Sequence, residues 1–133
     1  MVKRTVILLS LFSLLAFGCS KEDLADFKGL FPLRKAIIEQ CDVKDVNVTL
    51  QNGHCIGVSF INSKYNDESQ EAQNEVRKKT LEIISRHYSD KDKIDRAWIA
   101  FVIHKRRYLV INYTNSLNTK FYKKAPDGSW KEG

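Results

Sequence analysis

Five consecutive residues, His104-Lys105-Arg106-Arg107-Tyr108, place four cationic or near-cationic side chains beside an aromatic ring. Such a cluster can bind phosphate or carboxylate groups, on an anionic lipid headgroup, a lipopolysaccharide or an acidic protein. The flanking residues predict that it occupies a turn between two strands. The alternative is a solvated turn whose charge discourages pairing with other strands.

Other residue types that could do chemistry do not form a recognisable pattern. His54, His87 and His104 are widely spaced, and Asp90, Asp92 and Asp95 alternate with lysines and lack the glycine of a calcium loop. No Gly-x-Ser-x-Gly turn is present for nucleophilic catalysis. We therefore predict no catalytic residues, no metal and no cofactor, although carboxylate pairs that meet only in space stay open as an alternative.

The first nineteen residues form a segment of their own. Lys3 and Arg4 precede an apolar run from Val6 to Ala16, and Gly18-Cys19 follows shortly after it. The run is short for a transmembrane helix, which needs about 20 apolar residues, and it has the organisation of a cleaved signal. This segment resembles the signal peptide and lipobox of bacterial lipoproteins. The alternative is an ordinary signal peptide beside an incidental cysteine.

The resemblance implies a processing route and a location. Residues 1–18 would be removed, Cys19 would become the lipidated, palmitate-bearing N-terminus, and the protein would be held in the bacterial cell envelope. Ser20, and not an aspartate, follows Cys19, which in this family favours the outer membrane. The periplasmic or external face stays open. Residues 19–29 would form a polar tether, and residues 30–133 a single small domain.

Two cysteines remain after the lipidated one. In an exported protein such a pair usually forms a disulfide, so we predict a bridge between Cys41 and Cys55, contributing about 3 kcal/mol. Two free thiols or a metal pair are the alternatives. The net charge of +6 falls by two when Lys3 and Arg4 are removed, which does not indicate a nucleic-acid partner.

Hydrophobic periodicity predicts the elements that position these residues. Leu30–Gln40 is predicted to form a helix with Pro32 in its first turn. Val46–Ile61 predicts a hairpin, because both halves alternate and Asn52-Gly53 suits a type I′ turn. Asp67–Ser89 predicts a long amphipathic helix.

The C-terminal third is predicted to be mostly strand. Ala97–Ile103 predicts a buried central strand, Tyr108–Thr114 its returning partner, and Lys120–Lys123 an edge strand. Trp130 is predicted to fold back onto the sheet. The fold class is therefore α+β: two helices on one face of an antiparallel sheet of four to five strands, in the order α-β-β-α-β-β(-β).

These predictions favour a non-catalytic binding or assembly module, attached to the membrane by Cys19 and facing an envelope protein partner. It would present either its sheet face or its basic hairpin. An inhibitor or immunity-type lipoprotein that blocks one enzyme or toxin is the alternative. A hydrolase with an unrecognised site is a third possibility.

Overall fold

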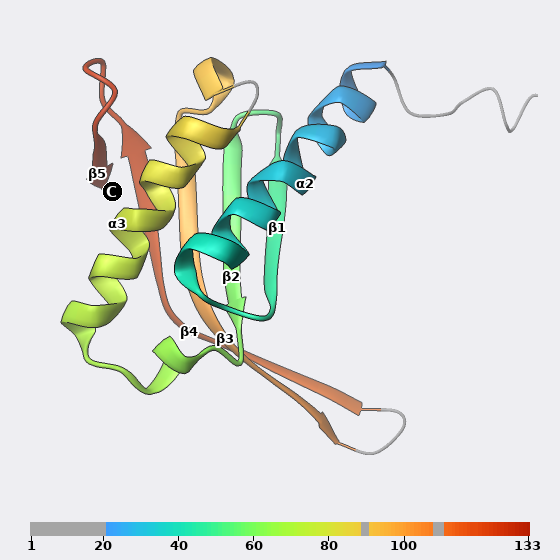
Figure 1. The fold of residues 1–133 in the computed structure, drawn as a ribbon, viewed down its shortest axis with the longest axis vertical. Helices are drawn as coiled ribbons and strands as arrows, with labels where there is room; N and C mark the ends of the chain where they lie inside the picture. The colour runs from blue at the N-terminus through green and yellow to red at the C-terminus, as the bar shows by residue number, and fades with distance from the viewer. Residues whose placement is uncertain (1–20, 89–90, 108–110) are drawn as a thin grey trace, which may run out of the picture.

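Two helices and a five-stranded sheet follow one another in the order α-β-β-α-β-β-β. The computed structural model describes the backbone of residues 21–88, 91–107 and 111–133. Both helices pack against one face of the sheet (Figure 1), which confirms the predicted α+β class. The predicted signal peptide and Cys19 lie outside the described residues. The elements are α2 (Lys21–Cys41), β1 (Val46–Gln51), β2 (Cys55–Ile61), η1 (Lys64–Asp67), α3 (Gln70–His87), η2 (Lys91–Lys93), β3 (Arg96–Arg107), β4 (Ile111–Lys124) and β5 (Trp130–Glu132).

The first hairpin forms where the alternating pattern predicts it. β1 pairs antiparallel with β2, from Val46 opposite Phe60 to Gln51 opposite Cys55. Asn52 and Gly53 have φ angles of 53° and 72°, as a type I′ turn requires at both central positions. Asparagine and glycine adopt this left-handed conformation at low cost, so the turn fixes the register of the hairpin.

One strand pairing differs from the prediction. The sheet order is β1-β2-β3-β4-β5, and β2 pairs with β3 in parallel, so the sheet is mixed and not wholly antiparallel. The reason lies in the connection: α3 carries the chain back along the sheet before β3 begins. A helical crossover of this kind returns the next strand in the same direction as the previous one.

The first helix begins earlier than predicted. α2 starts at Lys21 and contains Pro32 in its interior, so most of the segment predicted to be a tether is helical. Pro32 removes one backbone hydrogen bond. Residues with high helix propensity, among them Glu22, Leu24 and Ala25, favour helix on the N-terminal side of that position.

The second helix begins later than predicted. Asp67 belongs to η1, and α3 starts after Ser69. The Ser69 hydroxyl accepts a hydrogen bond from the Ala72 amide at 3.2 Å. A side-chain oxygen at this position satisfies an amide that has no partner within the helix.

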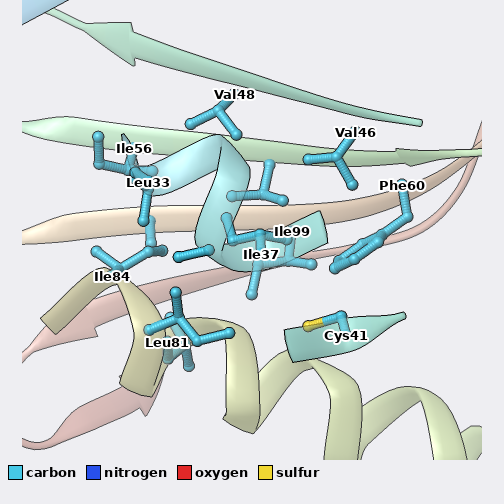
Figure 2. Close-up of a cluster of buried hydrophobic side chains, with 14 of the residues drawn as sticks. Leu33, Ile37, Cys41, Val46, Val48, Ile56, Phe60, Leu81, Ile84 and Ile99 are labelled. Atoms are coloured by element: carbon cyan, nitrogen blue, oxygen red, sulfur yellow. The ribbon is translucent and has the colours of Figure 1, made fainter. Parts of the chain in front are cut away.

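The hydrophobic core lies between the two helices and the sheet (Figure 2). Leu33 and Ile37 of α2 are fully buried against strand residues. Phe60 and Phe101 stack with ring centroids 5.5 Å apart. The apolar face of each central strand therefore meets the apolar stripe of a helix, which is the main source of stability for a domain of this size.

The end of the chain forms the outer strand. The segment Lys120–Lys123, predicted to be an edge strand, belongs to β4, and the edge is β5. Trp130 pairs with Lys124, and its indole Nε1 donates to the Ser85 hydroxyl of α3 at 3.0 Å. The prediction that Trp130 folds back onto the sheet is confirmed.

Candidate functional site

The cationic cluster predicted to form a turn is part of an arm made by β3 and β4. Pairing of β2 with β3 ends at Ile61 opposite Val102. Beyond that point, residues 103–107 of β3 continue to pair with residues 111–115 of β4. Figure 1 shows these two strands leaving the rest of the sheet as a projecting ribbon. His104, Lys105, Arg106 and Arg107 therefore lie in a strand, which corrects the predicted turn, and Tyr108 lies outside the described residues.

Because residues 104–107 lie in a strand, their side chains are divided between its two faces. Successive strand residues point to opposite faces, so His104 and Lys105, both exposed, do not share one surface. The prediction missed this because a run of charged residues resembles a loop in sequence. An isolated two-stranded ribbon is only marginally stable in water, so the base of the arm must be held by the body of the domain.

Asn62 holds the β3 side of that base. Its side-chain amide donates to the His104 carbonyl at 2.9 Å, and its side-chain oxygen accepts from the His104 amide, also at 2.9 Å. The backbone amide of Asn62 donates to the Val102 carbonyl at 2.8 Å. The Asn62 side chain thus continues the hydrogen bonding of β2 by one position, and the φ angle of 46° at Asn62 turns the backbone away.

A register shift marks the β4 side of the base. Ile99 faces Lys120, whereas Phe101 faces Leu117, so β4 contains one extra residue at this point. Asn118 lies in the bulge with a φ angle of 49°. Such bulges bend a strand and increase its twist, and this one lies where the arm leaves the sheet.

Buried polar side chains of α3 bind this bulge. The Arg77 guanidinium donates to the Asn118 carbonyl at 2.6 Å, and the Asn118 amide donates to the Gln73 side-chain oxygen at 3.3 Å. Arg77 is only 1 % exposed and lies over the Phe101 ring, 4.8 Å from its centroid. Burial lowers the pKa of Arg77. Sequence reasoning did not identify these residues, because nothing in the sequence shows which strand residue they meet.

The predicted disulfide between Cys41 and Cys55 is wrong, because both residues are free cysteines. Cys41 lies at the end of α2, before β1, whereas Cys55 faces Gln51 at the far end of β1. The intervening strand carries the two apart by roughly 17 Å. The Cys41 thiol is buried near the Thr80 hydroxyl, at 3.9 Å, and burial raises its pKa.

The three histidines lie in different places. His54 Nδ1 is 2.7 Å from Asp95 Oδ1, His87 Nε2 is 3.1 Å from the Gln40 side-chain nitrogen, and His104 belongs to the arm. Across residues 21–88, 91–107 and 111–133, no three His, Cys, Asp or Glu side chains come together as a metal site would require. Asp90 lies outside the described residues.

The helix-free face of the sheet carries a second feature. Trp98 faces Gly57 across β2 and β3, and a Cβ atom on Gly57 would lie 2.2 Å from the indole carbon Cζ2. The indole therefore occupies the space that any other side chain would fill. Trp98 therefore lies on the open, helix-free face of the sheet.

Comparisons of the chain with protein-family models, with curated proteins and with solved structures found no match. Within the described part of the chain, no helix combines the length and the apolar character needed to cross a membrane.

Proposed function

We propose that this chain is a lipid-anchored envelope protein that acts as a non-catalytic binding or assembly module and presents the β3–β4 arm to a protein partner. The observation that carries the proposal is the placement of the arm. It projects from the end of the molecule opposite the start of α2 (Figure 1). A lipid on Cys19, two residues before α2, would hold one end of the molecule and leave the arm facing away from that membrane.

The length of α2 supports the same arrangement. Its 21 residues span about 30 Å, so the helix separates the lipidated end from the loop that follows Cys41. The basic residues of the arm would then meet a partner beyond the membrane surface and not the headgroups of the anchoring bilayer. Positive charge there would favour an acidic surface on the partner and speed its association.

Among the described residues, a His-Asp pair beside a cysteine resembles part of a catalytic site, but it supports a structural role better than a chemical one. His54 binds Asp95, and Cys55 follows His54 in sequence. Burial raises the pKa of the Cys55 thiol despite the opposing effect of Arg96. A nucleophilic cysteine needs the opposite shift, toward the thiolate.

The anchor can be tested with Cys19→Ala. In cells given labelled palmitate, the unaltered chain should incorporate the label and fractionate with outer membranes, and the variant should do neither. Cys55→Ser is the matched control and should behave like the unaltered chain. A Cys19→Ala chain that keeps its lipid label would contradict the anchor.

The binding role can be tested by photocrosslinking in intact cells. A photoreactive residue replaces Lys105 of the arm in one full-length chain and Lys91 of η2 in another. Both lysines are exposed, and η2 lies at the end of the molecule opposite the arm (Figure 1). We expect one discrete protein adduct from position 105 and none from position 91. Equal adducts from both positions, or none from position 105, would contradict an arm-directed binding role.

The projecting arm also favours the inhibitor alternative, because a narrow ribbon can enter the cleft of an enzyme. The two roles differ in their consequence for the partner. If the adduct from position 105 contains an enzyme whose activity falls on addition of this protein, and Lys105→Glu restores that activity, the inhibitor role holds. An unchanged activity favours the assembly role.

A further inference from the structure

A groove of about 410 Å³ lies at the end of the sheet away from the arm. The first residues of β3, the last residues of β4 and the β1–β2 turn meet there. Trp98, Phe121, Arg96 and Lys123 line it together with Gln51 and Cys55. The neighbouring strand residues Ile56 and Ala97 face the helices and are buried, so these lining side chains belong to the opposite, helix-free face.

The Trp98 indole is held in one position. It lies over Gly57, and its Nε1 donates to the Gln51 side-chain oxygen at 3.3 Å. The Thr49 hydroxyl also lies beside Gly57, 2.7 Å from where a Cβ atom would be, and it is buried without a hydrogen-bond partner. A buried hydroxyl without a hydrogen-bond partner lowers the stability of the fold.

A second aromatic ring adjoins the groove. Phe121 faces Trp98 across β3 and β4, and it is 60 % exposed. Among the described residues it is one of only two large hydrophobic side chains with that degree of exposure. Directly opposed strand residues have their Cβ atoms about 5 Å apart, so the two rings border the same space.

Two cations also line the groove, as do His54 and Gly133. Arg96 faces Lys123 across the same two strands, and both are exposed. Neither takes part in any ion pair among residues whose side chains are described. The adjacent Asp95 carboxylate is engaged by His54 at 2.7 Å, which lowers the pKa of Asp95.

From this combination we infer that the groove binds a sugar ring that carries a carboxylate. The electron-rich face of an aromatic ring attracts the partly positive C–H groups of a pyranose. It would also attract a cation, but Arg96 and Lys123 oppose a cationic ligand and favour a carboxylate. The volume suits a small ligand, and the Gln51 amide nitrogen and the polar side chain of Asn52 are placed to meet ring hydroxyls. This groove is separate from the arm, so a test of sugar binding here is independent of the proposed function of the arm.

The test is a calorimetric titration of the full-length lipidated protein in detergent micelles with glucuronate, glucose and benzoate. We expect glucuronate to bind, glucose to bind at least about tenfold more weakly because it lacks the carboxylate, and benzoate to bind more weakly than glucuronate. A titration with oligogalacturonate distinguishes a polymeric ligand from a free sugar acid. If the natural ligand is a polymer, oligogalacturonate should bind more tightly than glucuronate.

Variants locate the site. The double variant Arg96→Gln, Lys123→Gln should weaken glucuronate binding at least about tenfold, whereas the matched pair Lys44→Gln, Lys91→Gln, at exposed positions outside the groove, should leave it unchanged. Equal binding of glucose and glucuronate, tighter binding of benzoate, or no binding of any probe would overturn the inference. Crosslinking from position 105 would be unaffected by any of these results.

Discussion

The Arg77 guanidinium, buried under α3, donates a 2.6 Å hydrogen bond to the carbonyl of Asn118 at the point where β4 bulges. A second guanidinium nitrogen donates to the Asn74 side-chain oxygen at 3.0 Å, while Nε has no partner. Burying an arginine without an adjacent carboxylate is costly. The buried Arg77 side chain holds the β4 bulge at Asn118 in place. This explains its position, because the bulge sets the direction in which the arm leaves the sheet.

We therefore expect Arg77→Met to loosen the arm as well as the fold. The change removes both hydrogen bonds, so the free energy of unfolding should fall by about 1–3 kcal/mol. Amide hydrogen exchange should speed up in residues 103–107, which depend on the bulge. Lys78→Met, an exposed position on the same helix, is the control. If both variants exchange alike in the arm, Arg77 does not position it.

Gly57 and Trp98 should be energetically coupled. Gly57→Ala would place a Cβ atom 2.2 Å from the indole and 2.7 Å from the Thr49 hydroxyl, so the indole must move, at a cost of about 1–3 kcal/mol. In a chain that already carries Trp98→Ala, the same change should cost much less. Urea denaturation of the two single variants and the double variant measures this coupling. Simple additivity would show that the indole does not occupy the space over Gly57.

Thr49→Val should stabilise the protein. The buried Thr49 hydroxyl has no hydrogen-bond partner, and valine replaces it with a methyl group of similar size. We expect the free energy of unfolding to rise by about 1 kcal/mol. Thr119→Val is the control, because the Thr119 hydroxyl is exposed and lies 2.7 Å from the Ser116 hydroxyl. A loss of stability in Thr49→Val would mean that the hydroxyl has a partner after all.

The two thiols of the domain should differ in reactivity. Cys55 is partly exposed, whereas Cys41 is buried, and burial raises the pKa of both. Iodoacetamide should therefore modify Cys55 slowly in the native protein and Cys41 only after denaturation. Mass spectrometry counts the adducts. A chain that is two mass units lighter and accepts no label at either residue after denaturation would restore the disulfide.

The ion pair that joins the end of α2 to η1 should make stability depend on pH. Lys64 Nζ lies 2.7 Å from Asp42 Oδ2. The lysine lowers the pKa of Asp42, and Asp42 raises the pKa of Lys64. A lowered carboxyl pKa gives stability that is present above the unfolded-state pKa, near 4, and is lost as the pH falls through the folded-state value. A raised lysine pKa gives stability that is present below about pH 10 and is lost as the pH rises further.

The comparison that isolates this pair is the urea midpoint of the unaltered chain against Asp42→Asn. The difference between them should be present at neutral pH, vanish in acid as Asp42 is protonated, and shrink in high salt because both side chains are exposed. Asp127→Asn is a poor control, since that carboxylate caps a turn; Asp92→Asn serves better. A difference that persists below pH 2 would have another origin.

Local patterns predicted the elements that depend on neighbouring residues. Asn52-Gly53 between two alternating runs fixed the first hairpin, because the turn geometry and the buried face both specify its register. The apolar run after Ala97 likewise predicted a central strand. Such features are determined over a few residues and can be read without knowing the rest of the fold.

Features that depend on distant residues could not be predicted in this way. The predicted Cys41–Cys55 disulfide was wrong because the number of cysteines does not show where they lie in the fold. These two lie at opposite ends of β1. The cationic run 104–107 predicts a turn because consecutive charged residues are typical of loops, whereas in the structure it is a strand that pairs only with β4. Arg96 lies opposite Lys123 because of the register between β3 and β4. The bulge at Asn118 changes that register by one residue between this pair and the arm.

The orientation of the protein on the membrane can be measured directly, by finding which end of the molecule lies near the lipid. Spin labels on Lys28→Cys and, separately, on Lys105→Cys, each in a lipidated chain carrying Cys55→Ser, are compared in vesicles that contain a lipid-bound paramagnetic relaxer. A lipid-anchored module that points its arm away from the membrane should show strong relaxation at position 28, near the start of α2, and little at position 105 in the arm. Equal or stronger relaxation at position 105 would contradict a membrane-anchored module that presents its arm outward.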